Sequence, residues 1–77
     1  MEDQIKEIIR FQLDLFNPVT NNEALVELGM DSLDRVEIIL ALEDEFVMRI
    51  PDEQCEKWET VQDVIDTITE AKDGRDK

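Results

Sequence analysis

Apolar residues recur at helical spacing near the N-terminus. They stand three or four positions apart at Ile5, Ile8, Ile9, Leu13 and Phe16. This spacing predicts an amphipathic helix over about residues 3–15, and Phe11 and Leu15 could widen its buried stripe. The helix must end before Pro18, because the residue that precedes a proline disfavours the helical region of backbone conformation.

A second helix is predicted to run from Ser32 to about Phe46. Asp31 suits the N-cap, and Asp34 follows three positions later, as in a capping box. One side of this helix carries an ordinary core stripe, made of Ile38, Ile39, Leu42 and Phe46. The opposite side is also apolar and carries Leu33, Val36, Leu40 and Val47. Since a surface helix of a small bundle cannot bury both sides, we expect one side to stay in contact with water.

The remaining segments predict a further helix and short connections. A long connection over residues 17–31 is expected to contain a short helical turn and to anchor on the core through Leu25, Val26 and Leu28. After the break at Pro51, "PDEQCEKW" suits one short helical turn. Thr60 is expected to cap a final helix whose buried stripe consists of Val61, Val64, Ile65 and Ile68. From about Lys72 onward we expect a frayed polar tail.

The predicted fold is therefore all-α. It is a small acidic bundle of three main helices and one short helix, forming a single domain over residues 1–77.

The apolar residues on the wet side of the second helix have two interpretations. The connection over residues 17–31 could fold over them, since scattered apolar residues are common on surfaces. Alternatively, they could form a docking surface for partners, which we favour because carboxylates surround them. These carboxylates are Asp31, Asp34, Glu37, Glu43 and Asp44.

Charge and composition narrow the function. The 77 residues carry a formal net charge of −13 and no histidine. This charge disfavours nucleic acid and anionic membranes as partners and favours basic protein surfaces. The chain lacks the usual general base and the commonest transition-metal ligand, and we expect no metal site. A single cysteine, Cys55, cannot form an internal disulfide, and no stretch has the length of a signal peptide or membrane span. We expect a cytoplasmic monomer.

Ser32 occupies a position suited to carrying a phosphate. Asp31 already fills the N-cap, so the Ser32 hydroxyl at the first helical position is free to face solvent. A phosphate ester there would lie against unpaired N–H groups and the positive end of the helix dipole. Catalysis by this serine is disfavoured, because no histidine can act as its base and its neighbours break the G-x-S-x-G pattern.

The stretch "LGMDSLDRVEIILALEDEF", followed by "IPDE", resembles an acyl carrier protein. The Asp-Ser-Leu attachment motif falls at Asp31, Ser32 and Leu33, and the resemblance extends over nearly the whole chain. It implies that Ser32 carries 4′-phosphopantetheine, transferred from coenzyme A by a phosphopantetheinyl transferase. The thiol of this arm would hold acyl groups as thioesters.

The resemblance also implies partners and an interior site. The helix that begins at Ser32 would bind basic patches on synthases, reductases, acyltransferases and the transferase. The residues implied in partner binding are Leu33, Asp34, Val36, Glu37, Leu40, Glu43 and Asp44. The residues implied in sheltering the acyl chain are Leu28, Ile38, Leu42, Phe46, Ile50, Val64 and Ile68. Fatty-acid biosynthesis is the pathway expected from the acidity and the free-standing length.

Some residues depart from the family pattern, and other functions stay open. Arg35 and the "VMR" stretch at 47–49 add positive charge where acidic or neutral residues are usual, which could alter partner choice. Trp58 is expected to cap the core, and Cys55 to be a packing residue. The alternatives are a carrier for polyketide, non-ribosomal peptide or other acyl transfer, and an acidic helical adaptor without a prosthetic group. The sequence contains no EF-hand loop pattern, although weak binding of divalent ions by the clustered carboxylates stays possible. A carboxylate-based hydrolase is disfavoured, because it would need a cleft for which a chain of this length has little room.

Overall fold

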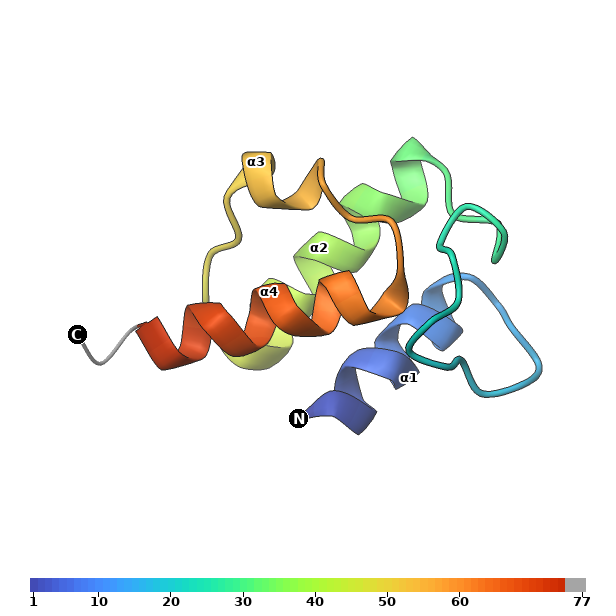
Figure 1. Cartoon of the computed structure of the whole chain (residues 1–77), viewed down its shortest axis with the longest axis horizontal. Coiled ribbons are helices and arrows are strands. Elements are labelled where there is room, and N and C mark those ends of the chain that lie inside the picture. The colour runs from blue at the N-terminus through green and yellow to red at the C-terminus, as the bar shows by residue number, and fades with distance from the viewer. Residues whose placement is uncertain (75–77) are drawn as a thin grey trace.

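The computed structural model describes residues 1–74 and contains four helices in this part of the chain. These are α1 (Glu2–Gln12), α2 (Ser32–Phe46), α3 (Asp52–Cys55) and α4 (Val61–Gly74). The described residues form no strand, and their one β-bridge joins Ala24 to Thr60. In Figure 1, α1, α2 and α4 pack together and the short α3 connects α2 to α4. The prediction of an all-α bundle with three main helices and one short helix is confirmed.

The core is built from the predicted apolar stripes. Ile5 and Ile9 of α1 meet Ile38 and Leu42 of α2, and each of these side chains is almost completely buried. The predicted stripe of α4 is buried along its whole length and consists of Val61, Val64, Ile65 and Ile68. Burying about ten aliphatic side chains, at about 1.5–3 kcal/mol each, supplies the main stabilisation of so small a domain.

α1 ends three residues earlier than predicted. The helix stops at Gln12, and Asp14 adopts a left-handed backbone conformation with φ of +56°. The reversal at Asp14 carries Phe16 away from the helix axis, and its side chain is 95% exposed. Phe11, at 74% exposed, also lies outside the core. Placing Phe16 on the buried stripe was therefore wrong, and Phe11 does not widen it, whereas Leu13 and Leu15 do pack against the core.

The connection between α1 and α2 packs against the start of α4. The N–H of Leu25 donates to the Glu59 carbonyl at 2.9 Å, and the N–H of Val61 donates to the Glu23 carbonyl at 3.1 Å. Leu25 is buried and Leu28 partly buried, as expected of anchors. Val26 is 79% exposed, so its predicted anchoring role was wrong. In Figure 1 this connection lies at one end of the bundle.

The last helix continues past the point where a tail was predicted. α4 runs to Gly74. Lys72 donates from Nζ to the Phe46 carbonyl at 3.4 Å, and its ammonium lies 5.5 Å from the centre of the Phe46 ring. This cation–π contact gives Lys72 a fixed partner on α2. The tail was therefore predicted to begin too early, and its last residues, 75–77, lie outside the described part of the chain.

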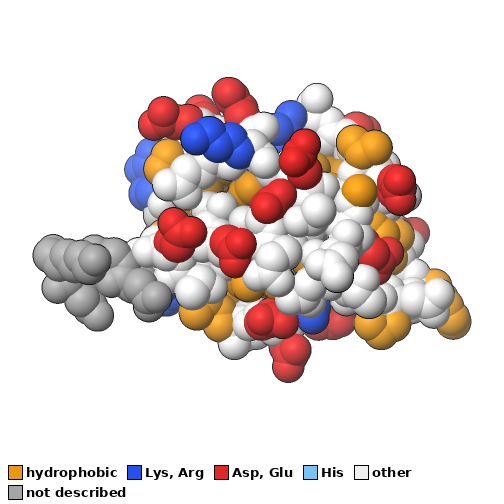
Figure 2. Space-filling model, viewed as in Figure 1, with side chains coloured by type: hydrophobic (Ala, Val, Ile, Leu, Met, Phe, Trp, Pro, Cys, Tyr) orange, Lys and Arg blue, Asp and Glu red, His pale blue; other side chains and the backbone are white. Residues whose placement is uncertain are grey.

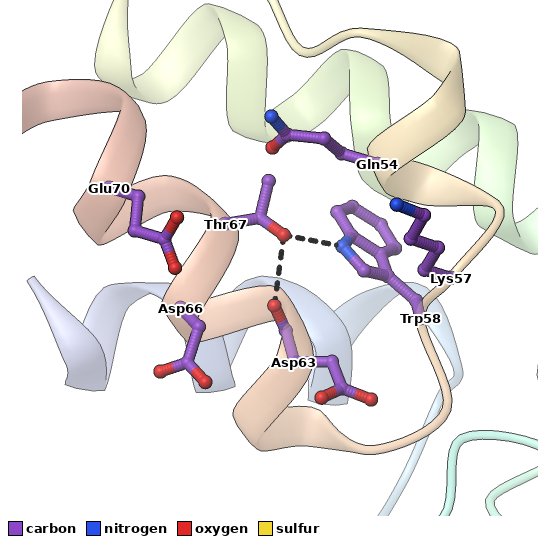
Figure 3. Close-up of a pocket in the computed structure, with 7 residues that line it drawn as sticks. All are labelled: Gln54, Lys57, Trp58, Asp63, Asp66, Thr67 and Glu70. Atoms are coloured by element: carbon purple, nitrogen blue, oxygen red, sulfur yellow. Dashed lines mark hydrogen bonds between the residues drawn. The ribbon is translucent and has the colours of Figure 1, made fainter. Parts of the chain in front are cut away.

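Trp58 joins the α3 segment to α4. Its indole Nε1–H donates to Thr67 Oγ1 at 2.9 Å, and the Thr67 hydroxyl donates to the Asp63 carbonyl at 3.0 Å (Figure 3). The ring is 6% exposed, as expected of a core cap. Cys55 is buried in the same layer, and burial, together with the nearby carboxylates, raises the pKa of its thiol. Both residues have the packing roles that the sequence predicted.

Candidate functional site

Ser32 is the first residue of α2, and its side chain is exposed. The chain reaches it through a turn at Gly29, whose φ of +97° suits glycine. Asp31 Oδ1 accepts the N–H of Asp34 at 2.8 Å, and Asp34 Oδ2 accepts the N–H of Asp31 at 3.4 Å. The predicted capping box is confirmed. Because Asp31 caps the helix, the Ser32 hydroxyl is not needed for that role.

The second apolar side of α2 is exposed to water. Its members, which we call the exposed strip, are Leu33 (66% exposed), Val36 (50%), Leu40 (59%) and Val47 (77%). The alternative in which residues 17–31 cover this side is wrong, because that connection is instead hydrogen-bonded to residues 59–62. Several exposed apolar side chains on one side of α2, beginning beside Ser32, are what is expected of a docking surface.

The carboxylates around the exposed strip differ in their hydrogen-bond partners and in their exposure. Glu37 accepts a hydrogen bond from Gln12 Nε2 of α1. Glu43 is partly buried and accepts the N–H of Ile50 at 2.8 Å, which ties the end of α2 to the segment before α3. Asp44 is exposed. Glu43 thus has a structural role that the sequence did not reveal, while Asp44 offers its charge directly to solvent.

Two connected pockets lie between α2 and α3, and together we call them the α2–α3 groove. The pocket of about 310 Å³ is lined by Ser32, Arg35, Val36, Ile39 and Cys55, among others. The second, of about 500 Å³, shares Val36 and Ile39 and continues to Arg49 and Ile50. Sequence reasoning missed Arg35 and Ile39 as neighbours of the serine, although Arg35 follows Ser32 by three residues, the spacing that places side chains on one helix face.

The residues predicted to shelter an acyl chain fill the core with one another. Ile38, Leu42, Phe46, Val64 and Ile68 are each at most 8% exposed. Leu28 packs against the core from its edge, and Ile50 is the one of the seven that also lines the α2–α3 groove. An interior acyl site made of these residues stays a prediction, because it requires them to separate.

A further pocket of about 350 Å³ lies on the opposite side of α3, between α3 and α4 (Figure 3). Its carboxylates are Asp63, Asp66 and Glu70, and Ser32 is not among its lining residues. Asp63 is already used as a cap: it accepts the N–H groups of Glu59 and Thr60 at 2.8 and 3.0 Å, and these bonds lower its pKa. In Figure 2 more acidic than basic side chains are visible on this face of the molecule, scattered among uncharged surface. The pocket is lined mainly by polar side chains, and the Thr67 hydroxyl in it is already engaged with Trp58 and the Asp63 carbonyl.

Residues 1–74 offer different surroundings to a metal ion, a membrane and a tethered phosphate. No group of three histidine, cysteine or carboxylate side chains in this part of the chain is arranged to hold a metal ion. None of its helices has the length and hydropathy of a membrane span. A phosphodiester on Ser32, in contrast, would meet the amino end of α2 and the Arg35 guanidinium, and the groove beyond offers apolar side chains. The residues present fit a phosphate-linked arm.

Comparison with known proteins points to the same chemistry. The profile of the phosphopantetheine attachment site family matches residues 3–68. A Mycobacterium tuberculosis protein assigned as an acyl carrier protein is 35% identical, with a TM-score of 0.84 over 88% of this chain and 93% of its own. The acyl carrier protein of Thermotoga maritima is 30% identical, with a TM-score of 0.82 over 96% and 94%. A chain in the structure of the ishigamide ketosynthase/chain length factor is 28% identical, with a TM-score of 0.75 over 91% and 90%.

Proposed function

The chain belongs to the phosphopantetheine attachment family of acyl carrier proteins, and we propose that it carries acyl groups as thioesters on an arm attached to Ser32. The cofactor of this family is covalently bound 4′-phosphopantetheine, and its acyl carrier proteins are carriers without catalytic activity of their own. The observation that carries the assignment of Ser32 is its exposed position at the first residue of α2, beside a cap that Asp31 already supplies.

The chemistry of attachment fits this position. In the loading step the Ser32 oxygen forms a bond to the phosphorus that bears the pantetheine half of coenzyme A, and the nucleotide half leaves. We propose that the base that takes the serine proton comes from the transferase, because this chain lacks histidine, the side chain most often used as a general base. The new phosphodiester keeps one negative charge, which the positive end of the α2 dipole stabilises.

The exposed strip is proposed as the surface that partner enzymes bind. Leu33, Val36 and Leu40 would supply apolar contact area next to the arm. Asp34, Glu37, Glu43 and Asp44 would attract basic patches on the transferase and on acyl-processing enzymes, and the net charge of −13 would speed association at low salt. Of these four, Asp44 is the simplest candidate for contacting a partner, because it is exposed and, unlike Asp34 and Glu43, it neither caps the helix nor binds the following segment.

The proposed pathway is fatty-acid biosynthesis. The acyl carrier proteins among the similar structures support an acyl cargo. Polyketide synthesis is the second candidate, favoured by the likeness to a chain in a ketosynthase/chain length factor structure. Both pathways use the same arm and thioester, so the partner enzyme and not the cofactor distinguishes them.

The pathway is tested by acyl transfer. The arm-bearing protein, charged with a malonyl group, is offered with an acetyl thioester as primer and NADPH as reductant, separately to a fatty-acid ketosynthase with its reductases and to a polyketide ketosynthase/chain length factor. Intact mass reports whether the acyl group is extended, reduced or left unchanged. Extension and reduction by the fatty-acid enzymes alone is the expected result. Turnover by the polyketide pair alone would favour the second candidate, and an inert thioester with both sets would contradict an acyl carrier of either pathway.

A further inference from the structure

Arg35 is a cation placed beside the proposed attachment site in a very acidic protein. It is the one basic residue of α2, a helix of 15 residues that contains five carboxylates. Its side chain is partly buried, and it lines the same pocket as Ser32. Side chains three positions apart on a helix lie about 5–6 Å from each other at Cβ. A group attached to the Ser32 oxygen would therefore extend over the part of the groove that Arg35 occupies.

The guanidinium of Arg35 has one weak partner. Its Nη1 donates to the Cys55 carbonyl at 3.4 Å, which is long for a hydrogen bond. Both ion pairs found among the described residues lie on α1, so none engages Arg35. A guanidinium presents five N–H donors and binds phosphate oxygens through two of them at once. Most of the binding capacity of this side chain is thus available to an anion in the groove.

We propose that Arg35 binds the phosphodiester on Ser32 and holds the first part of the arm in the α2–α3 groove. This inference rests on the proposed attachment of the arm to Ser32. The two methyl groups that follow the phosphate in pantetheine would then lie against Val36 and Ile39, which form the apolar wall of the groove. Arg35 is a positioning residue here: it biases where the arm lies and takes no part in a reaction.

Two features of the groove oppose this contact and limit its strength. Asp52 and Glu56 line the same pocket, and their carboxylates would repel the phosphate. Solvent also reaches the site, because Ser32 and both of these acidic residues are exposed. We therefore expect a bias of roughly 1.4- to 5-fold toward the bound arm, the range that exposed ion pairs provide, so that partner enzymes can still withdraw the arm.

The test compares the protein with and without its arm by nuclear magnetic resonance. Intact mass first establishes that the sample carries one arm on the wild-type chain and none on Ser32→Ala. The Arg35 Nε–Hε signal is then followed from the unmodified to the arm-bearing protein, and the phosphorus relaxation of the phosphodiester is measured in wild type, Arg35→Gln, Arg35→Lys and Arg49→Gln. Arg49 lines the far part of the groove and serves as the matched control for loss of one positive charge.

We expect the Arg35 signal to shift when the arm is attached. The phosphorus should be more mobile in Arg35→Gln than in wild type, and its mobility in Arg35→Lys should lie between those two. Arg49→Gln should resemble wild type. An unchanged Arg35 signal, or equal effects of Arg35→Gln and Arg49→Gln, would overturn it while leaving the carrier function intact. If Arg35→Gln does not fold, the proposal is tested by the shift of the Arg35 signal in the wild-type protein and by the phosphorus relaxation of Arg35→Lys. Absence of the arm from the wild-type chain would contradict the proposed function itself.

Discussion

Two leucines on α2 provide a matched test of which side of the helix faces partners. Leu40 belongs to the exposed strip and is 59% exposed, whereas Leu42 is completely buried in the core. Full burial of a leucine is worth about 1.5–3 kcal/mol, so Leu40, with about two-fifths of its surface covered, contributes at most about 1 kcal/mol. Leu42→Ala also leaves a cavity, and such changes cost about 2–5 kcal/mol. The same substitution two residues apart should therefore give very different stabilities.

The assay is urea or thermal unfolding followed by helical circular dichroism and by the fluorescence of the buried Trp58. For a domain of this size each kcal/mol changes Tm by about 4–8 °C. Leu42→Ala should lower Tm by at least about 8 °C, and Leu40→Ala by only a few degrees. Leu40→Ala should instead reduce kcat/KM for loading by the transferase, by roughly 5-fold if Leu40 is central to the interface. Equal destabilisation by both changes would show that Leu40 is buried and would refute the docking surface.

Three further predictions concern stability. Hydrogen bonds from backbone N–H groups lower the pKa of Asp63 in the folded chain below its ordinary value of 3.8. The ionised carboxylate therefore stabilises the fold above that pH, and this stabilisation is lost as the pH falls through the lower pKa of the folded chain. The Tm advantage of wild type over Asp63→Asn should vanish in acid, and a Tm difference that stays constant with pH would contradict this prediction. Trp58→Phe removes the hydrogen bond to Thr67 and should cost about 1 kcal/mol in chemical unfolding; an unchanged midpoint would show that this bond contributes nothing. Raising the ionic strength from about 0.01 to about 0.15 M shortens the screening length from about 30 to about 8 Å, so Tm should rise, because the net charge of −13 repels itself less; a flat salt titration would argue against this repulsion.

The sequence predicted α2 well because its signals are local. The capping box of Asp31 and Asp34 marks the first residue, and the helix ends where Val47 turns left-handed with φ of +50°. Its two apolar sides follow from the helical period alone. The period therefore predicted that one side stays exposed, while the structure was needed to show that residues 17–31 leave Leu33, Val36 and Leu40 uncovered.

The sequence predicted the segment after α1 poorly because its structure depends on distant contacts. Residues 13–16 contain no glycine or other sequence signal that predicts the left-handed conformation of Asp14. This turn leaves the Phe16 side chain exposed. The path of the following connection is set by hydrogen bonds to residues 59–62, some forty positions away. The α2–α3 groove likewise brings Arg35 close to Cys55, a neighbour that spacing along one helix cannot reveal. The structural role of Glu43 could not be predicted for the same reason, because the Ile50 N–H that it accepts lies outside the helix.

The central claim is that the hydroxyl at the start of α2 carries the arm. The direct measurement is the intact mass of the purified chain after incubation with coenzyme A and a broad-specificity phosphopantetheinyl transferase, followed by peptide mass spectrometry to locate the added group. Ser32 is the single serine of the chain, and Thr20→Ala, which removes another exposed hydroxyl, serves as the control for Ser32→Ala. One arm on wild type and on Thr20→Ala, on the peptide that contains Ser32, with none on Ser32→Ala, is the predicted result. An unmodified wild-type chain, or an arm that persists in Ser32→Ala, would contradict the account.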